Sequence, residues 1–276
     1  MQHKTMKNGN FELNTIFNLD CVEGLAQMQP ESVDFVLTSP PYDNLRRYGD
    51  LSAWNFEKFQ EVAQLLAAVI KPGGVIVWVV GDSTVNGSET GSSFRQALYF
   101  KDNCSLNLYD TMIFAKSNPI PGNQRRYQQA FEYMFVFSKG TPTAFNPIVE
   151  KCQQFGRSQQ WGRSNNLAEK TAKHLRANDI RITKENKLHS NIFTYGVGSN
   201  PTGHPAVFPL KLALEMVATW SNPNDTVLDP FSGSGTTAVA AIQLQRNFIG
   251  FEINPDYYAA SVERIKQAQQ QLTIKF

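Results

Sequence analysis

The clearest signal of fold in this chain is the stretch Thr226-Val-Leu-Asp-Pro-Phe-Ser-Gly-Ser-Gly-Thr-Thr-Ala238. Its first three residues predict a strand, and a helix is predicted over Thr236–Leu244, so Gly233 and Gly235 lie in the turn between them. Glycine lets a backbone approach a ligand closely, and the N-terminus of a helix favours negative charge. The stretch therefore predicts a ligand-binding turn between a strand and a helix.

An acidic residue follows this turn at an informative distance. A strand is predicted over Asn247–Ile253, and Glu252 near its end lies 19 residues after Gly233. At this spacing a carboxylate can hydrogen-bond the hydroxyls of a ribose, so the turn and the acid together indicate a nucleoside cofactor. The glycine spacing also fits a dinucleotide fingerprint of the form GxGxxA, and a purely structural turn is a third interpretation.

Strands and helices alternate along most of the chain. The apolar run Val75–Val80 is typical of a strand buried on both faces of a parallel sheet. Apolar residues at helical spacing predict a helix over Phe56–Ile70, ended by Lys71-Pro-Gly-Gly74. Asn254 is predicted to cap the last helix, with Pro255 as its first residue. Further strands are predicted at Val33–Thr38, Met112–Ala115 and Tyr133–Ser138, and a further helix at Leu210–Trp220. This alternation predicts an α/β fold with a mainly parallel, doubly wound sheet.

Composition limits the class of protein. The chain has 276 residues, of which 41% are hydrophobic and 18% charged, which suits one large domain with an insertion. Cys21, Cys104 and Cys152 form no CxxC pair, which argues against a zinc ribbon, a thioredoxin-like site or a disulfide scaffold. The histidines are scattered, so no metal site is predicted. No apolar stretch reaches the roughly 18 residues of a membrane span and no signal peptide is recognisable, so we expect a cytoplasmic protein.

The stretch from about 151 to 203 differs from the rest of the chain. It has few apolar residues and many Gln, Asn, Arg and Lys. Between Lys151 and Ser190 there are nine Lys and Arg residues against three acids, a formal charge of +6, so the rest of this +2 chain carries −4. A solvated loop or helical insertion is one interpretation. A nucleic-acid contact element is the other, because Lys and Arg neutralise phosphates, and Gln, Asn and Arg can read base edges.

A second motif, Thr38-Ser-Pro-Pro-Tyr42, directly follows the predicted strand Val33–Thr38. Two adjacent prolines continue neither a strand nor a helix, so they form a rigid turn at the carboxyl end of the strand, where open α/β sheets bind ligands. The turn holds a hydroxyl, a carbonyl and an aromatic ring side by side. A plain proline-rich turn is the alternative. Ser39 and Tyr42, however, are the residue types that can hydrogen-bond to and stack on a flat, amine-bearing base.

Together, Thr38–Tyr42 and Asp229–Thr237 resemble the motifs of the DNA amino-methyltransferases, which transfer methyl from S-adenosylmethionine to an exocyclic nitrogen. In that family a [DNS]PP[YFW] motif is the catalytic loop and FxGxG is the cofactor loop. The order found here, with the catalytic loop first and a variable region between the two, resembles the circularly permuted β group. The resemblance implies a single Rossmann-like methyltransferase domain over 1–276, with a target recognition region inserted at about 151–203.

The expected site residues fall into three groups. Catalytic roles are implied for Ser39, Pro40, Pro41 and Tyr42. Cofactor contacts are implied for Asp20, Cys21, His204, Phe208, Asp229, Phe231, Gly233, Gly235, Thr236 and Glu252. DNA contacts are expected from Arg125, Arg157, Arg163 and Arg176. Family members usually have Gly-Asp where this chain has Leu19-Asp20, a departure that bears on the role of Asp20.

The chemistry implied is an in-line displacement by an amine whose lone pair is delocalised into the base. The Ser39 hydroxyl and the Pro40 carbonyl can accept hydrogen bonds from that amine and position it, and Tyr42 would stack on a base flipped from the duplex. In the family SPPY is commonly associated with cytosine N4 and DPPY with adenine N6, so Ser39 favours cytosine N4, with adenine N6 as the alternative. Cytosine C5 methylation needs a cysteine nucleophile, supplied in its own family by a Pro-Cys pair that this chain lacks.

Three other functions are compatible with the sequence. They are a methyltransferase that acts on RNA, protein or a small molecule, a nicotinamide oxidoreductase, and a non-enzymatic DNA-binding module. The oxidoreductase leaves the proline motif unexplained, and the basic stretch rich in Asn and Gln favours duplex DNA as substrate. The resemblance also allows two partners, a cognate restriction nuclease and a second copy of the chain in a homodimer. A membrane partner is not expected.

Overall fold

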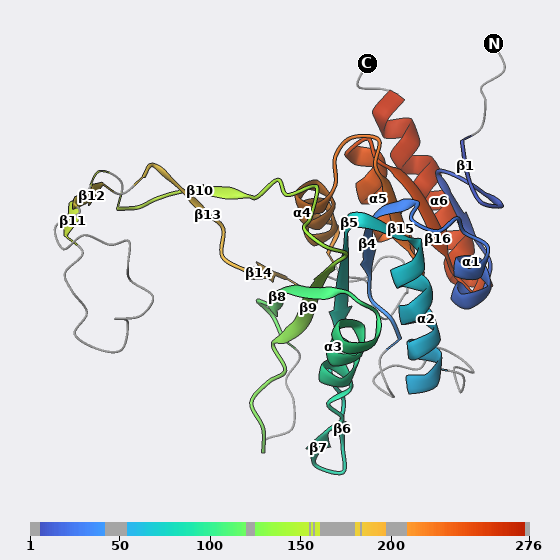
Figure 1. Cartoon of the computed structure of the whole chain (residues 1–276), viewed down its shortest axis with the longest axis horizontal. Coiled ribbons are helices and arrows are strands. Elements are labelled where there is room, and N and C mark those ends of the chain that lie inside the picture. The colour runs from blue at the N-terminus through green and yellow to red at the C-terminus, as the bar shows by residue number, and fades with distance from the viewer. Residues whose placement is uncertain are drawn as a thin grey trace. The chain divides into compact units, whose positions relative to one another are not determined.

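The computed structural model of the chain describes residues 6–41, 54–119, 125–154, 156, 158–160, 180–182, 184–196 and 209–273 (Figure 1). Contacts between residues divide the chain into two compact units. The larger unit, called the body, comprises Met1–Asn146 and Asn191–Phe276. The smaller, called the ribbon unit, comprises Pro147–Ser190 and so contains the whole +6 stretch.

The body is built on an eight-stranded sheet with the strand order β14-β8-β9-β5-β4-β15-β16-β3. In this order the strands are β14 (Ile192–Tyr195), β8 (Asn107–Lys116), β9 (Phe131–Ser138), β5 (Ile70–Val80), β4 (Val33–Thr38), β15 (Thr226–Asp229), β16 (Asn247–Phe251) and β3 (Thr15–Phe17). Five of the seven neighbouring pairs in this sheet are parallel, and β9 runs antiparallel to both of its neighbours. The predicted α/β fold with a mainly parallel sheet is confirmed.

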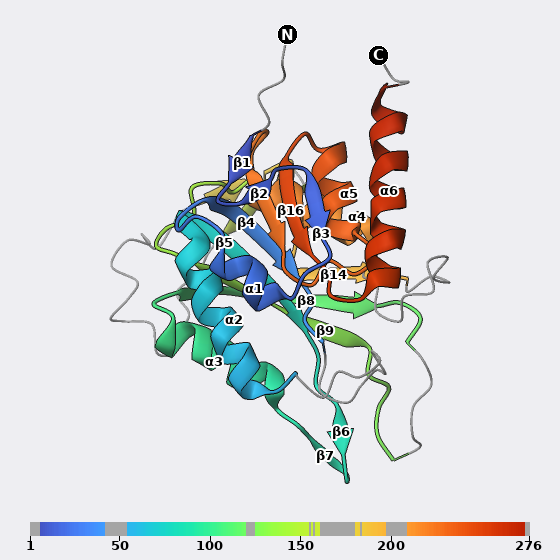
Figure 2. The same cartoon turned by 90° about the vertical axis from the view of Figure 1, so that its right-hand side faces the viewer.

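Helices cover both faces of the sheet (Figure 2). One layer contains α1 (Cys21–Ala26), α2 (Phe56–Val69) and α3 (Ser92–Asn103), and the other contains α4 (Leu210–Trp220), α5 (Thr236–Gln243) and α6 (Pro255–Thr273). The double cover explains the continuous apolar run in β5, where Val75–Val80 is no more than 2% exposed. In the described part of the chain, no helix has the length and apolar character needed to cross a membrane.

Several predicted bounds are confirmed. The observed β4 and α4 have the predicted bounds. Asn254 caps α6 as expected, since its Oδ1 accepts hydrogen bonds from the backbone nitrogens of Asp256 and Tyr257 at 2.9 and 3.2 Å, and Pro255 is the first residue of the helix. β16 is shorter than predicted because its pairing with β3 ends at Phe251, which leaves Glu252 just beyond the strand.

The segment after α2 differs from the prediction. The helix ends at Val69, one residue before the predicted end, and Lys71-Pro-Gly-Gly74 belongs to β5, which starts before the predicted strand Val75–Val80. Gly73 has φ +79°, and its backbone nitrogen donates to the carbonyl of Lys139 at 2.6 Å, which holds this segment on the sheet. The pairing with β4 shifts register between Val33 and Phe35, so the extra residues are absorbed as an irregularity of the strand.

The ribbon unit consists of two short antiparallel ladders. β10 (Val149–Lys151) pairs with β13 (Asn186–Leu188), and β11 (Ser158–Gln160) pairs with β12 (Ile180–Ile182). Val149 and Leu188 are 58% and 60% exposed, so the first ladder buries little of its own surface. β14 also lies within the predicted recognition region of about 151–203, but it pairs with β8 in the sheet of the body.

Two further pairs of very short strands occur in the body. They are β1 (Lys7–Asn8) with β2 (Phe11–Glu12), and β6 (Thr84–Val85) with β7 (Ser88–Glu89).

Candidate active site

The carboxyl ends of four parallel strands lie at one edge of the sheet. β4, β15, β16 and β3 are neighbours and run in the same direction. The proline turn, which belongs to the motif Thr38–Tyr42, follows β4, and the glycine turn, which belongs to the motif Asp229–Thr237, follows β15. Glu252 follows β16, and Asn18–Cys21 follows β3. Motifs that are far apart in the sequence are therefore side by side, at the edge where open α/β sheets bind ligands.

A buried hydrogen bond joins the last residue of β4, before the proline turn, to the last residue of β15, before the glycine turn. The hydroxyl of Thr38, the last residue of β4, donates to Asp229 Oδ1 at 2.6 Å, and the backbone nitrogen of Phe231 donates to the same oxygen at 3.1 Å. Burial raises the pKa of Asp229 to about 6, although hydrogen bonds from Thr38, Thr237 and Phe231 lower it. Since Asp229 is only 4% exposed, its carboxylate fixes the two turns against each other. The predicted cofactor contact of Asp229 stays a prediction.

The glycine turn has a backbone shape that other residues adopt with strain. Gly233 and Gly235 have φ values of +50° and +78°. A Cβ atom on Gly235 would lie 3.1 Å from the Cβ of Ser261 in α6, so a side chain there would be tightly packed against the helix as well as strained. Thr236 begins α5 immediately after the turn, as predicted for a turn that leads into a helix N-terminus.

Glu252 is held by the glycine turn and retains capacity for a ligand. Its Oε2 accepts a hydrogen bond from the backbone nitrogen of Gly233 at 2.7 Å, and its Oε1 accepts one from Asn254 at 2.8 Å. Burial raises the pKa of Glu252, with a smaller contribution from the carboxylate of Asp229, and backbone hydrogen bonds from Asn254, Gly233 and Ile253 lower it. A carboxylate has about four acceptor positions, so the side chain keeps capacity to accept a hydrogen bond from a ribose hydroxyl. The residues present therefore fit the nucleoside part of S-adenosylmethionine.

The segment after β3 is tied to Glu252. The side-chain amide of Asn18 donates to the carbonyl of Glu252 at 2.8 Å, and the backbone nitrogen of Leu19 donates to the same carbonyl at 3.2 Å. Asp20 caps α1 by accepting from Val22 at 2.9 Å, and its Oδ1 lies 3.1 Å from Lys58 Nζ. These contacts hold Asp20 at the predicted cofactor edge. They also give it a structural role as a helix cap.

Cys21 follows Asp20 and is buried. Burial raises the pKa of its thiol to about 12, with a further contribution from the carboxylate of Asp20, so the thiol stays protonated near neutral pH. Cys21 can therefore serve the site through packing and backbone contacts, and not as a nucleophile.

Aromatic rings gather beside the glycine turn. The ring of Phe231 lies 5.1 Å from that of Trp54 and 6.2 Å from that of Trp78, both edge-on. Trp78 donates a hydrogen bond from Nε1 to Gln96 Oε1 at 2.8 Å. Phe231, predicted from the FxGxG motif, thus also anchors the glycine turn to the apolar core.

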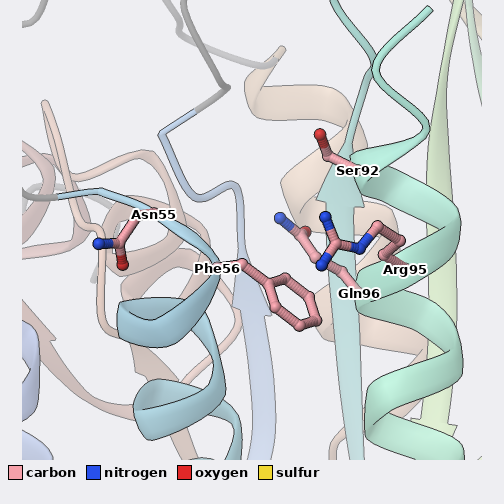
Figure 3. A pocket seen from close by; sticks show the side chains of 5 residues that line it. All are labelled: Asn55, Phe56, Ser92, Arg95 and Gln96. Atoms are coloured by element: carbon pink, nitrogen blue, oxygen red, sulfur yellow. The ribbon is translucent and has the colours of Figure 1, made fainter.

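A small pocket opens where α2 and α3 begin, and it is lined by Asn55, Phe56, Ser92, Arg95 and Gln96 (Figure 3). The guanidinium of Arg95 lies over the ring of Phe56, 4.1 Å from its centroid. This pocket was not predicted, because its residues lie at the starts of two separate helices and form no motif.

The predicted residues are only partly within the described structure. Ser39, Pro40 and Pro41 lie at the end of β4, with Ser39 half-buried and Pro40 buried, and Arg125 is exposed. Six predicted residues lie outside the described ranges: Tyr42, Arg157, Arg163, Arg176, His204 and Phe208. Among the residues that the structure describes, no group of three or more His, Cys, Asp or Glu could hold a metal ion.

Known proteins share both the sequence pattern and this fold. The family described as DNA methylase matches residues 33–263. The chain is 43% identical over 247 residues to the orphan methyltransferase M.BamHII of Bacillus amyloliquefaciens, which covers 85% of this chain and 89% of that protein.

Two solved structures are similar as a whole. The PvuII DNA methyltransferase, which is cytosine-N4-specific, has a TM-score of 0.67 at 22% identity and covers 97% of this chain and 93% of its own. The M1.HpyAVI–SAM complex has a TM-score of 0.61 at 25% identity, with 91% and 98% covered. The family match extends over most of the chain and includes the proline turn, the glycine turn and Glu252. The chain therefore belongs to the DNA methylase family, the N4/N6 amino-methyltransferases that use S-adenosylmethionine to methylate DNA.

Proposed function

We propose that this chain transfers a methyl group from S-adenosylmethionine to the N4 amine of cytosine in duplex DNA. The observation that carries this choice of target is Ser39, which occupies the first position of the catalytic motif at the carboxyl end of β4. In the DNA amino-methyltransferases a serine at this position is commonly associated with cytosine N4, and an aspartate with adenine N6.

The reacting amine would be held by the proline turn. The Ser39 hydroxyl and the Pro40 carbonyl oxygen accept hydrogen bonds from its two N–H groups, which positions the nitrogen and draws its lone pair out of the base ring. Tyr42 stacks on the flipped base. The hydrogen bond between Thr38 and Asp229 keeps the proline turn in place relative to the glycine turn. S-adenosylmethionine, when bound, supplies the methyl group from its sulfonium.

The glycine turn and Glu252 would hold the cofactor. At the N-terminus of α5, the cofactor can come close to the backbone of Gly233, Gly235 and Thr236. Glu252 would accept hydrogen bonds from the ribose hydroxyls. Asp20, Cys21, His204 and Phe208 are assigned to the same ligand by resemblance.

DNA contacts are assigned to the ribbon unit and to Arg125. A two-stranded antiparallel ribbon fits the major groove of B-DNA, and the stretch Lys151–Ser190 carries a formal charge of +6. Arg157, Arg163 and Arg176 belong to this stretch. The recognition region of about 151–203, a cognate restriction nuclease, a homodimer and a cytoplasmic location stay predictions.

Nucleoside mass spectrometry tests the target atom. The purified full chain is incubated with duplex DNA and methyl-labelled S-adenosylmethionine, with Ser39→Ala as the control, and the DNA is digested to nucleosides. The expected product is labelled N4-methylcytosine. Labelled N6-methyladenine would overturn the choice of cytosine, and label that enters only RNA would overturn DNA as the substrate.

A further inference from the structure

The last helix contacts the glycine turn through a residue that no motif includes. Arg264 of α6 reaches Ser234, which lies between the two glycines of the turn. Its Nη1 is 2.6 Å from the carbonyl oxygen of Ser234, 2.7 Å from Ser234 Oγ and 3.3 Å from the hydroxyl oxygen of Thr236. One guanidinium nitrogen thus connects the centre of the turn with the first residue of α5.

The same face of α6 closes the turn from behind. Ser261, one helical turn before Arg264, lies 3.1 Å from the position that a Cβ atom on Gly235 would occupy, and Ile16 of β3 lies 3.4 Å from it. The turn is therefore confined between β3 and α6. Gly235 has a left-handed backbone conformation, and Ser261 of α6 lies directly beside it.

The charge of Arg264 is placed where simple electrostatics disfavours it. Arg264 lies at the N-terminus of α5, the positive end of the helix dipole, and burial lowers its pKa. Among the described residues, no carboxylate forms an ion pair with it. Its observed partners are the carbonyl and the two hydroxyls named above. The arginine is therefore held here by its hydrogen bonds to Ser234 and Thr236 and not by an ion pair.

We propose that Arg264 is a positioning residue for the cofactor, which acts by holding Ser234 and Thr236 so that the glycine turn keeps the shape that receives S-adenosylmethionine. This role rests on the proposed function of the glycine turn. It adds α6 to the cofactor site, although α6 contributes no residue that would touch the reacting atoms.

The chain offers a matched control in Arg246. This residue is also half-buried, burial lowers its pKa although the carboxylate of Asp225 raises it, and it also holds a serine and backbone carbonyls. Its Nε lies 3.1 Å from Ser221 Oγ and its Nη2 lies 2.7 Å from the carbonyl oxygen of Ser221. Arg246 directly precedes β16 and so lies at the amino end of that strand, opposite the edge that carries the glycine turn. It therefore reports what the loss of such an arginine does to stability alone.

The test compares R264Q, R264K and R246Q in the full chain. We measure the melting temperature, the Kd for S-adenosylhomocysteine by calorimetry, and kcat and KM on duplex DNA. R264Q is expected to raise the Kd and the KM for S-adenosylmethionine about 10- to 100-fold, with kcat at saturating cofactor within about twofold of the wild type. R264K should keep part of the affinity, because an ammonium can still donate to the Ser234 carbonyl. R246Q should lower the melting temperature and leave both cofactor constants unchanged.

Failure of this role is distinguishable from failure of the cofactor assignment. If R264Q and R264K bind S-adenosylhomocysteine as tightly as R246Q does, Arg264 is only structural and the inference is overturned. Gly235→Ala tests the turn itself. If G235A binds S-adenosylhomocysteine as tightly as the wild type does, the glycine turn is not the cofactor site, and the proposed role of Arg264 fails with it. Weak binding by G235A together with wild-type binding by R264Q overturns the role of Arg264 alone. Should R264Q not fold, R264K carries the comparison.

Discussion

The cofactor edge of the body and the ribbon unit are built in opposite ways. At the edge, side chains hold together segments from different strands, since Thr38 donates to the buried Asp229 and the half-buried Glu252 accepts from the backbone of Gly233. In the ribbon unit, the ladder of β10 and β13 has mostly exposed side chains, and Lys187 Nζ lies 3.3 Å from a carboxylate oxygen of Glu150.

The difference fits the two activities that we propose for these regions, methyl transfer at the cofactor edge and DNA contact in the ribbon unit. Methyl transfer needs acceptors and cofactor held in fixed geometry, which buried hydrogen bonds between adjacent strands provide. Contact with DNA needs positive charge and accessible side chains, and a narrow ribbon exposes most of its residues. We therefore expect changes at the edge to alter turnover or stability, and changes in the ribbon unit to alter DNA affinity.

The largest effect is expected from Ser39→Ala. Loss of one of the two proposed acceptors for the target amine should lower kcat by about 100- to 1,000-fold, the range seen when one positioned polar group is removed from an active site. The Kd for S-adenosylhomocysteine should stay within about twofold of the wild type, because the cofactor contacts are made by other residues. Single-turnover methylation of duplex DNA and calorimetry measure the two quantities.

Ser32→Ala is the control for this variant. Ser32 directly precedes β4 and so lies at the opposite end of the strand that Ser39 follows. Its hydroxyl bonds Asn8 and Gln29, away from the site. It should change stability and not turnover. Equal losses of turnover and cofactor affinity in Ser39→Ala would contradict a role of Ser39 in holding the amine.

A smaller effect, on stability, is expected at Asp229. Its pKa is raised from 3.8 to about 6 in the folded state, so between these values the folded chain binds more protons than the unfolded chain. Stability therefore falls as pH rises from 4 to 6, and the penalty is fully present above pH 6. Asp229→Asn cannot titrate. The stability of the variant minus that of the wild type should rise by about 2 kcal/mol between pH 4 and pH 7.

Urea unfolding at several pH values measures this difference. No rise between pH 4 and pH 7 would show that the Asp229 carboxylate is not buried as the structure has it.

Local sequence patterns predicted the fold well and the contacts within the site less well. The apolar run Val75–Val80 and the cap at Asn254 predicted their elements because both signals depend on near neighbours. The role of Thr38 was not predicted, because its partner Asp229 lies 191 residues further along the chain. Arg264 was missed for the same reason, since an arginine on a polar helix face carries no local sign of a buried contact.

The segment Lys71–Gly74 shows a different limit. Proline and glycine predicted the end of a helix correctly within one residue. They could not show that the same residues would join the next strand, because that outcome depends on the hydrogen bond from Gly73 to Lys139 of a distant segment.

The most direct test of the division between the body and the ribbon unit is a pair of titrations on one variant, Arg157→Gln/Arg163→Gln/Arg176→Gln. We predict that its Kd for S-adenosylhomocysteine stays within about twofold of the wild type, while its affinity for duplex DNA falls about tenfold at moderate salt. The slope of log affinity against log salt should become shallower by up to about 2.7 if all three arginines contact phosphates. Unchanged DNA affinity and salt slope, or a loss of cofactor affinity equal to the loss of DNA affinity, would contradict the account.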